Sequence, residues 1–514
     1  MSGLGDRVQG WVLSNPRRGG WLSRTLPESF SEKMGRSKVL RIFREASETV
    51  PAYRELLESK NVDPAAVRDY EAFQSLPLLD KQSYLIPFQD TPEKLCVGGR
   101  LDACYAITRS SGTTGHPIYW PWIERQDGST VRGMETMWVN FWDVDRVSTL
   151  IIICFDLGMW GAGEMGAQVA RVIAKKYGHI SVATPGSNIE ATLETISHLA
   201  HNYEQILVLG YPPFLRQLVG GGKDAGVDWK GLKIAFLPGG EGYSEHWRDT
   251  MLEQLGRRGS LTTILGAFGS SEGQVIGPET PLSVLVRRLA NDDAGLRRDL
   301  YGTESNCDAL VQYTPAGVFV EMIDGEIVIT NGGAVPVIRY NSHDMGGSTS
   351  FAHVMEVLES RGYGPQYLRD AGVSELHVWQ MPFLYAFGRK DCVIVDGANI
   401  YAEGVAPALL KPGMETITNW KLTVQEREDG RLQFVILVES REGVGPVASE
   451  DSRSQHYRSV FLEQLLEVNP DFHSAYRNNP ECLTPSVVVY EHGRGPFEGE
   501  VSKIKQRHIY RGPL

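Results

Sequence analysis

The chain is poor in cysteine and lacks a long apolar run. Its 514 residues include six cysteines, which are scattered and form no C-x-x-C pair. We therefore expect reduced, mostly packed thiols and no structural zinc site. The longest apolar segment, 150–163, is too short to span a bilayer and contains Asp156. No stretch near the N-terminus resembles a signal-peptide core, so these absences predict a cytoplasmic protein.

The chain also lacks an excess of positive charge. It has 51 lysines and arginines against 63 aspartates and glutamates, a formal net charge of −12. That balance argues against a general surface for nucleic acid or acidic membrane, so neither is expected as a partner, while a local basic site stays open. Apolar residues make up 42% and charged residues 22% of the chain, as in globular proteins. A chain of this length is expected to form two or more domains; its oligomeric state, a homodimer included, is left open.

Apolar strand-like runs alternate with helical patterns between about residues 149 and 236. Runs typical of buried strands lie at 149–155, 180–183, 205–209 and 232–237, with helical patterns between them at 168–176, 189–201 and 214–218. This alternation predicts a mainly parallel sheet that helices cover on both faces. The first hundred residues predict helices and loops, with a helical rhythm at Leu40, Ile42, Phe43 and Ala46.

The pattern changes to hairpins after about residue 302. Asp324-Gly325, a pair that tolerates positive φ, separates strand-like runs at 318–323 and 326–329. A second hairpin is predicted around Asp429-Gly430, followed by a helix at 456–468 and a strand at 486–490. We therefore predict an α/β protein. A large domain over 1–387 has mainly parallel sheets covered by helices plus a hairpin-rich subdomain, and a small α+β domain covers 388–514.

One short string indicates a phosphate-binding loop. It consists of Ser110, Ser111, Gly112, Thr113, Thr114 and Gly115, followed by a histidine and a proline. The glycines let the backbone wrap closely around an anion, and the four hydroxyls supply hydrogen-bond donors without adding charge. Such a loop suits a polyphosphate that Mg²⁺ already partly neutralises. It is not a Walker loop, because no lysine follows the last glycine.

A second glycine pattern suggests a dinucleotide site but does not fit one. Gly161, Gly163 and Gly166 satisfy G-x-G-x-x-G between a strand-like run and a helical pattern. The next predicted strand, 180–183, should then end near an acidic residue for the ribose. It ends instead in Thr184-Pro185-Gly186. The hypothesis that the chain is an oxidoreductase therefore rests on these three glycines alone.

Several strings resemble those of the adenylate-forming superfamily of acyl-CoA synthetases, luciferases and peptide-synthetase adenylation domains. Beyond the phosphate-loop string, the segments 50–54 (VPAYR), 76–81 (LPLLDK), 184–188 (TPGSN) and 210–213 (GYPP) look like those of the phenylacetate-CoA ligase-like branch. The resemblance runs along nearly the whole chain. It implies an ATP- and Mg²⁺-dependent carboxylic acid ligase that forms an acyl-adenylate, releases pyrophosphate and transfers the acyl group to coenzyme A.

The resemblance also implies which residues bind the nucleotide. Gly239, Gly240 and Glu241 would lie along the adenine, and Phe268 would pack on the purine, with Gly269 beside it in the same nucleotide-binding string. Ser271 would contact phosphate and Glu272 would hold Mg²⁺, for which a hard oxygen ligand is suited. Serine at 271 replaces the family's usual threonine, and Phe268 lacks the usual tyrosine hydroxyl.

Three further positions follow from the same resemblance. Asp344 would accept hydrogen bonds from both ribose hydroxyls, although Asn341 and His343 depart from the family's motif around it; His343 is interpreted as structural. Arg389 lies in the segment 387–391, which resembles the hinge at which the small, mobile C-terminal domain rotates. Near the C-terminus, Lys503 takes the place of the adenylation lysine, with Ser502 replacing a glycine and Lys505 as the fallback.

The sequence does not identify the carboxylic acid or the acyl acceptor. An unusually aromatic set could wall the acyl pocket and favours an aryl or apolar acid: Trp138, Phe141, Trp142, Phe155, Met159 and Trp160. Plain core packing explains each of them equally well. Two alternatives also stay open. The acyl group could pass to an amine, another nitrogen nucleophile or a carrier-protein thiol, or the chain could be a non-catalytic nucleotide-binding protein on the same fold.

Overall fold

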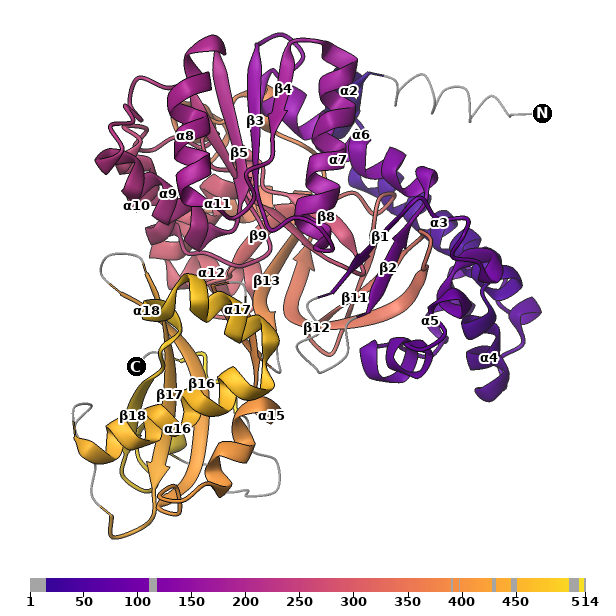
Figure 1. Cartoon of the computed structure of the whole chain (residues 1–514). Helices are drawn as coiled ribbons and strands as arrows, with labels where there is room; N and C mark the ends of the chain where they lie inside the picture. The colour runs from indigo at the N-terminus through magenta and orange to yellow at the C-terminus, as the bar shows by residue number, and fades with distance from the viewer. Residues whose placement is uncertain are drawn as a thin grey trace. The chain divides into compact units, whose positions relative to one another are not determined.

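The computed structural model describes residues 15–110, 118–389, 392–396, 398–427, 431–444, 451–498 and 508–512. These form two compact units, one made of the described residues up to 387 and the other of those from 388 onward. Figure 1 colours the first from indigo to orange and the second from orange to yellow. Within this described part, no helix is both long and apolar enough to cross a bilayer.

The first unit begins with helices, of which the first packs against the later helix at 124–142 and the others share a core with an antiparallel sheet. They are α2 (Pro16–Thr25), α3 (Glu28–Thr49), α4 (Pro51–Ser59) and the short α5 (Tyr70–Gln74). Ile42, Phe43 and Ala46 on α3 are buried, which agrees with the helical rhythm expected there, whereas Leu40 is only partly buried. The 3.6-residue period places these apolar side chains on one face, and that face contributes to a shared core with the sheet strands.

A four-stranded parallel sheet forms the centre of the first unit. Its strands, β3 (Thr149–Cys154), β4 (Ile180–Ala183), β5 (Gln205–Gly210) and β6 (Ile234–Pro238), lie in the order β4-β3-β5-β6. Alternate residues of β3 enter different cores: Ile151 and Ile153 pack on one face, and Leu150 and Ile152 on the other. Both faces of the sheet are therefore covered.

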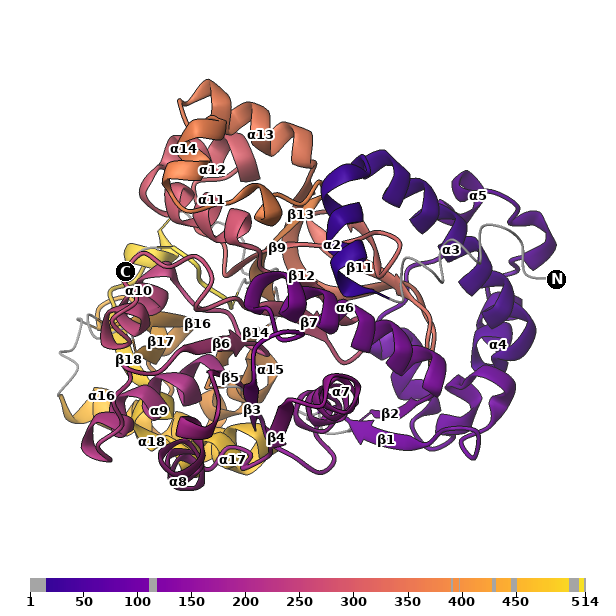
Figure 2. The ribbon, with the colours of Figure 1, turned by 90° about the horizontal axis from the view of Figure 1, so that it is seen from above.

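The covering helices divide between the two faces. On one face lie α6 (Glu124–Trp142) and α7 (Gly161–Tyr177), and on the other α8 (Ile189–Leu199), α9 (Pro212–Asp224) and α10 (Glu245–Gln254). Figure 2 shows α7 and α8 on opposite sides of the strands. Local signals begin and end these helices: the Asn188 side chain caps α8, and Gly178 ends α7 at φ 72°.

Antiparallel strands and four further helices complete the description of the first unit. A five-stranded sheet has the order β10-β11-β12-β13-β9, with β9 (Ala309–Gln312), β10 (Phe319–Ile323), β11 (Glu326–Asn331), β12 (Val337–Thr349) and β13 (Phe383–Arg389). Asp324 and Gly325 form the predicted turn, with φ of 52° and 77°. Two short hairpins pair β1 (Ala106–Arg109) with β2 (Tyr119–Trp122) and β7 (Ala267–Ser270) with β8 (Gln274–Pro278). The helices α11 (Pro281–Asp292) and α12 (Ala294–Tyr301) lie between β8 and β9 in the chain, and α13 (Phe351–Ser360) and α14 (Pro365–Asp370) lie between β12 and β13.

The second unit is a small α+β structure with a core of its own. A three-stranded sheet pairs β16 (Ile417–Glu426) antiparallel and β18 (Ser486–Tyr490) parallel to the central β17 (Leu432–Ser440). The helices α16 (Ser452–Val468) and α17 (Pro470–Asn478) pack against it, and β14 (Cys392–Val395) and β15 (Ala398–Tyr401) form a hairpin. The predicted helix at 456–468 and strand at 486–490 are present; the turn pair at 429–430 lies outside the described residues.

Candidate active site

Two hydrogen bonds between Ser110 and Ile118 close the base of the predicted phosphate loop. The Ser110 backbone N–H donates to the Ile118 carbonyl (2.8 Å), and the Ile118 N–H donates to the Ser110 hydroxyl (3.0 Å). These two bonds close the ends of the segment that follows β1 and precedes β2. Of the loop itself, Ser111, Gly112, Thr113, Thr114 and Gly115 lie outside the described residues.

Arg109 stands immediately before this loop and was not singled out from the sequence. Its guanidinium carbon lies 5.2 Å from the centre of the Trp160 ring, and its backbone N–H donates to the Met159 carbonyl at 2.8 Å. No carboxylate pairs with Arg109 within the described part of the chain. A cation next to a hydroxyl-rich string was a usable signal, because guanidinium groups bind phosphate oxygens well. Two predicted pocket residues thus lie beside the phosphate-loop base.

The predicted adenine segment lies at the carboxyl edge of the parallel sheet, directly after β6. The Gly239 N–H donates to the Gly210 carbonyl (3.2 Å), and Gly239 forms a parallel bridge with Ala267 at the start of β7. Gly240 has a φ of 81°, and a Cβ there would lie 2.8 Å from the Tyr211 ring, so both the backbone and the packing require glycine. Ligands of open α/β sheets bind at this edge.

The predicted Mg²⁺ segment lies next to the adenine segment through that bridge. Phe268 and Gly269 belong to β7, while Ser271 and Glu272 occupy the turn before β8. Glu272 is half-buried, and its carboxylate accepts a hydrogen bond from the Tyr340 hydroxyl at 3.3 Å. That contact joins the turn to the strand that carries the predicted ribose aspartate. The structure therefore brings the adenine, magnesium and ribose segments together.

Asp344 lies in a bulge of β12. The pairing of β11 with β12 shifts between Val328–Asn341 and Glu326–Met345, which leaves extra residues on β12, and His343 there has a φ of 59°. The His343 ring lies between two carboxylates, with Nδ1 3.3 Å from Glu326 and Nε2 3.5 Å from Asp80. These contacts support the structural interpretation of His343.

Asp80 connects this bulge to the segment 76–81. Leu79 bridges Tyr340: the Leu79 N–H donates to the Arg339 carbonyl at 3.0 Å, and the Asn341 N–H donates to the Leu79 carbonyl at 2.7 Å. Burial alone would raise the pKa of Asp80, but hydrogen bonds from Ser83 and the nearby His343 hold it below its usual value. The segment 76–81, which resembles a family string, therefore supports the strand that carries the predicted ribose aspartate.

The predicted magnesium site consists of one protein carboxylate, that of Glu272, and this residue lies in the described part of the chain. No group of three or more His, Cys, Asp or Glu side chains arranged to hold a metal ion occurs there. Glu272 fits a hard cation as one oxygen ligand whose remaining positions are filled by phosphate oxygens and water, the usual arrangement for Mg²⁺ at a nucleotide.

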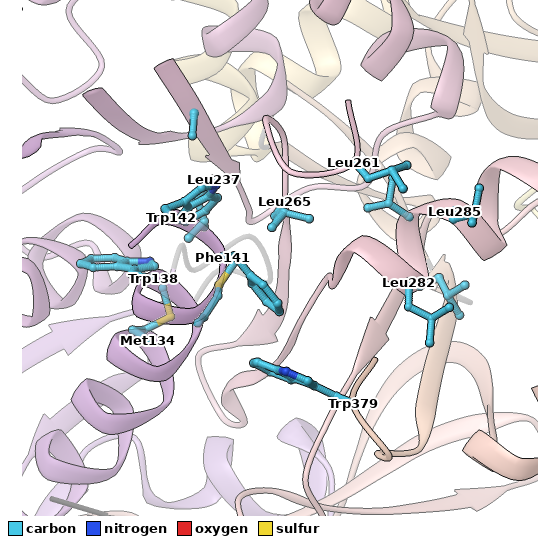
Figure 3. Close-up of a cluster of buried hydrophobic side chains, with 14 of the residues drawn as sticks. Met134, Trp138, Phe141, Trp142, Leu237, Leu261, Leu265, Leu282, Leu285 and Trp379 are labelled. Carbon is cyan, nitrogen blue, oxygen red and sulfur yellow. The ribbon is translucent and has the colours of Figure 1, made fainter. Parts of the chain in front are cut away.

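The predicted pocket aromatics separate into two groups. Figure 3 shows Trp138, Phe141 and Trp142 on α6 within a cluster of buried apolar side chains. Trp138 is fully buried, Phe141 stacks on Trp379 with ring centres 4.7 Å apart, and Trp142 donates to the Thr262 carbonyl at 2.7 Å. These contacts give all three a core-packing role.

The second group lies near the candidate site. Phe155 follows β3 and packs edge-on against Tyr211, with ring centres 4.8 Å apart. Its ring would also lie 3.7 Å from a Cβ at Gly239. Met159 is 42% exposed, and Trp160 stacks under Arg109. Met159 and Trp160 therefore remain available as pocket walls, whereas Phe155 is only 5% exposed and belongs to the same buried cluster as Trp138.

The second unit contains the remaining predicted residues. Arg389 ends β13, and its guanidinium donates to the Tyr401 hydroxyl at 3.1 Å. Lys503 and Lys505 lie outside the described residues. The chain after them is anchored on β16, where His508 stacks on Trp420 with ring centres 4.2 Å apart and Ile509 bridges Leu422.

Comparison with known proteins supports the fold. No family model and no curated protein sequence matches the chain. Among solved structures, 2-hydroxyisobutyryl-CoA ligase with 2-HIB-AMP and CoA is similar at a TM-score of 0.60 and 15% identity, over 95% of this chain and 91% of that one. The same ligase in its postadenylation state with 2-HIB-AMP gives 0.53 and 14%, over 96% and 91%. The predicted fold class is confirmed: this chain has the fold of the adenylate-forming ligases, with a large N-terminal and a smaller C-terminal unit.

Proposed function

We propose that this protein is an ATP- and Mg²⁺-dependent carboxylic acid ligase that forms an acyl-adenylate and then a coenzyme A thioester. One observation carries the proposal: Gly239, Glu272 and the β12 strand of Asp344 meet at the carboxyl edge of the parallel sheet. They are joined by the Gly239–Ala267 bridge and the Tyr340–Glu272 hydrogen bond. The residues 1–387 would bind nucleotide and acid, and 388–514 would act as a mobile lid.

The chemistry requires two anions to react. A carboxylate oxygen of the acid attacks the α-phosphorus of ATP, the bond to the bridging oxygen breaks, and pyrophosphate leaves. Catalysis therefore depends on charge neutralisation and in-line placement rather than on a covalent nucleophile. Mg²⁺ held through Glu272 would neutralise phosphate charge when bound. In the second step the coenzyme A thiolate attacks the acyl carbonyl, and AMP leaves.

Each candidate residue has a role in this scheme. Asp344 would hold the ribose, Phe268 would pack on the purine, and the hydroxyls from Ser110 to Thr114 would bind the departing pyrophosphate. Arg109 adds a positive charge at the base of that loop. Lys503 would supply the ammonium that stabilises charge at the α-phosphate during adenylation.

The acid is proposed to be aryl or otherwise apolar. Met159 and Trp160 support this class, because they place thioether and aromatic surface beside the phosphate-loop base. Core burial of Trp138, Phe141, Trp142 and Phe155 reduces the number of wall candidates, and the two that remain are still apolar in character.

A pyrophosphate-exchange screen tests the first step. The purified chain is incubated with ATP, labelled pyrophosphate and a panel of aryl, alkyl and hydroxy acids. Exchange that depends on one acid supports adenylation, and the Asp344→Asn variant should lose it. ATP binding without exchange for any acid would favour the non-catalytic alternative.

The acceptor is tested separately by product analysis. With the active acid identified, coenzyme A, amines, other nitrogen nucleophiles and a carrier-protein thiol are offered in parallel, and thioesters and amides are resolved by mass spectrometry. A coenzyme A thioester is the expected product. Accumulation of acyl-AMP with coenzyme A present, and an amide or carrier thioester with another acceptor, would replace the thioester step.

The assignment of the lysine has a matched control two residues away. Lys503→Ala should abolish exchange while leaving ATP binding measurable, because the ammonium acts on the transition state. Lys505→Ala carries the same loss of charge in the same segment and should retain exchange. The reverse result would move the role to Lys505.

A further inference from the structure

A cluster of charged side chains is buried directly behind the adenine and magnesium segments. It contains Glu245 and Arg248 on α10, Glu279 after β8 and Arg287 on α11. The side chain of Arg248 is 0% exposed, and none of the other three exceeds 4%. Burial of an isolated charge costs several kcal/mol, so a cluster this deep must be internally compensated.

The cluster is compensated by pairing. Arg248 lies 2.7 Å from Glu279 and 3.0 Å from Glu245, while Arg287 lies 3.3 Å and 3.5 Å from the same two carboxylates. The charges of these two guanidinium groups and two carboxylates sum to zero. At the edge of the cluster Arg288, 17% exposed, also lies 3.2 Å from Glu245, and it pairs with Asp249 at 2.6 Å. The Tyr243 ring lies close to both cations, at 5.2 Å from each guanidinium carbon. Such a buried, mutually paired arrangement has directional bonds and little freedom to relax.

These bonds extend to the backbone on both sides. One oxygen of Glu279 accepts from the Gly266 N–H at 2.7 Å and from the Tyr243 hydroxyl at 2.6 Å. Arg248 donates to the Ile264 carbonyl at 2.6 Å, and Arg287 donates to the Tyr243 carbonyl. The cluster therefore holds the chain just before β7 and the chain just after the adenine segment.

Those two stretches are the ones that the candidate site uses. Gly266 precedes Ala267, the bridge partner of Gly239, and Tyr243 follows Glu241 by two residues. The approach is close: a Cβ at Gly266 would lie 2.5 Å from the Tyr243 hydroxyl oxygen. One carboxylate thus bonds both to a residue close to the adenine segment and to a residue close to the strand that leads to Glu272.

We propose that Glu279, through Tyr243 and Gly266, is a positioning residue that sets the width of the adenine site. The inference rests on the proposed function. A short, charge-assisted hydrogen bond fixes direction as well as distance, which apolar packing at the same place does not. Loosening it shifts the two segments relative to each other, and the base loses contacts on one side.

The test compares two tyrosines that make the same bond. Tyr243→Phe removes the hydroxyl that donates to Glu279, and Tyr177→Phe removes one that donates to Glu135 at the same 2.6 Å, on α7 and α6. ATP affinity is measured by calorimetry on the full chain, with thermal unfolding in parallel. Tyr243→Phe should weaken ATP binding about tenfold, since a buried acceptor loses a donor, and Tyr177→Phe should leave it unchanged.

A double-mutant cycle gives an independent readout. Gly266→Ala places a methyl group against the Tyr243 hydroxyl and should weaken ATP binding strongly. The same change in the Tyr243→Phe background should cost less, because the clashing oxygen is gone. Additive losses would overturn the proposed geometry.

The failures of the two proposals can be told apart. Equal ATP affinity in wild type and Tyr243→Phe, or an equal loss in Tyr177→Phe, overturns the positioning role alone. A wild-type chain that binds no ATP overturns the proposed function and this inference with it.

Discussion

Two clusters of charged side chains support the candidate site, and they differ in burial. The cluster around Glu279 is sealed, with each guanidinium within 3.5 Å of both carboxylates. The cluster around His343 is open: the imidazole and Asp80 are 35% and 30% exposed, and their distance is 3.5 Å. Water can replace lost partners in the second cluster but not in the first. Burial therefore decides which cluster is a rigid support and which can adjust.

The largest expected effect breaks the sealed cluster. Arg248→Ala leaves Glu245 and Glu279 with one fewer buried cation, so the free energy of unfolding should fall by about 3–5 kcal/mol. Urea denaturation measures this change. Arg100→Ala, which breaks an exposed pair with Asp102, is the control and should leave the midpoint unchanged. A similar small effect in both would mean that the buried pairing adds little.

Acid should affect the sealed cluster through Glu279. Burial alone would raise the pKa of Glu279, but Arg248 and Arg287 lower it from 4.5 to about 2. Because the pKa is lower in the folded state, the carboxylate stabilises the fold at pH values above the unfolded-state pKa. That contribution is lost as the pH falls from about 4.5 through about 2. Unfolding free energies measured against pH should show this loss in wild type. Glu279→Gln should lack that part of the slope.

The smallest expected effect concerns the open cluster. His343→Gln removes the ring between Asp80 and Glu326, and because the site is partly exposed, stability should change by less than about 1 kcal/mol. Nucleotide affinity should still fall several-fold, since the bulge carries Asp344. Calorimetry with ATP and thermal unfolding separate the two. Unchanged affinity would mean that the bulge holds its shape without the histidine.

Much of the fold was predictable because it depends on local periodicity. The strand at 180–183 occurs as predicted, and the Asp324-Gly325 turn has the positive φ values that its residue types allow. The helix predicted at 168–176 begins earlier, at Gly161. Packing requires one glycine of the G-x-G-x-x-G pattern, because a Cβ at Gly163 would lie 1.9 Å from the Asp156 carbonyl oxygen, whereas a Cβ at Gly166 would meet nothing within 4 Å.

The site was predictable only as a set of motifs. Nothing in the spacing of Gly239, Glu272 and Tyr340 indicates that the first lies beside β7 and that the last two are hydrogen-bonded. The same holds for the aromatic set, where Trp138 is core and Met159 is exposed although both lie in one short stretch. Side-chain burial depends on what other segments cover, and sequence separation does not reveal it.

The sequence by itself determined the α/β alternation, the hairpin turns and the motif resemblance, because each depends on residues within a few positions of one another. Tertiary structure alone decided that Glu279 accepts hydrogen bonds from the Gly266 N–H and the Tyr243 hydroxyl. It also decided that Arg248 pairs with both Glu245 and Glu279. Buried charges require partners in three dimensions, and these come from different strands and helices that only the folded chain brings together.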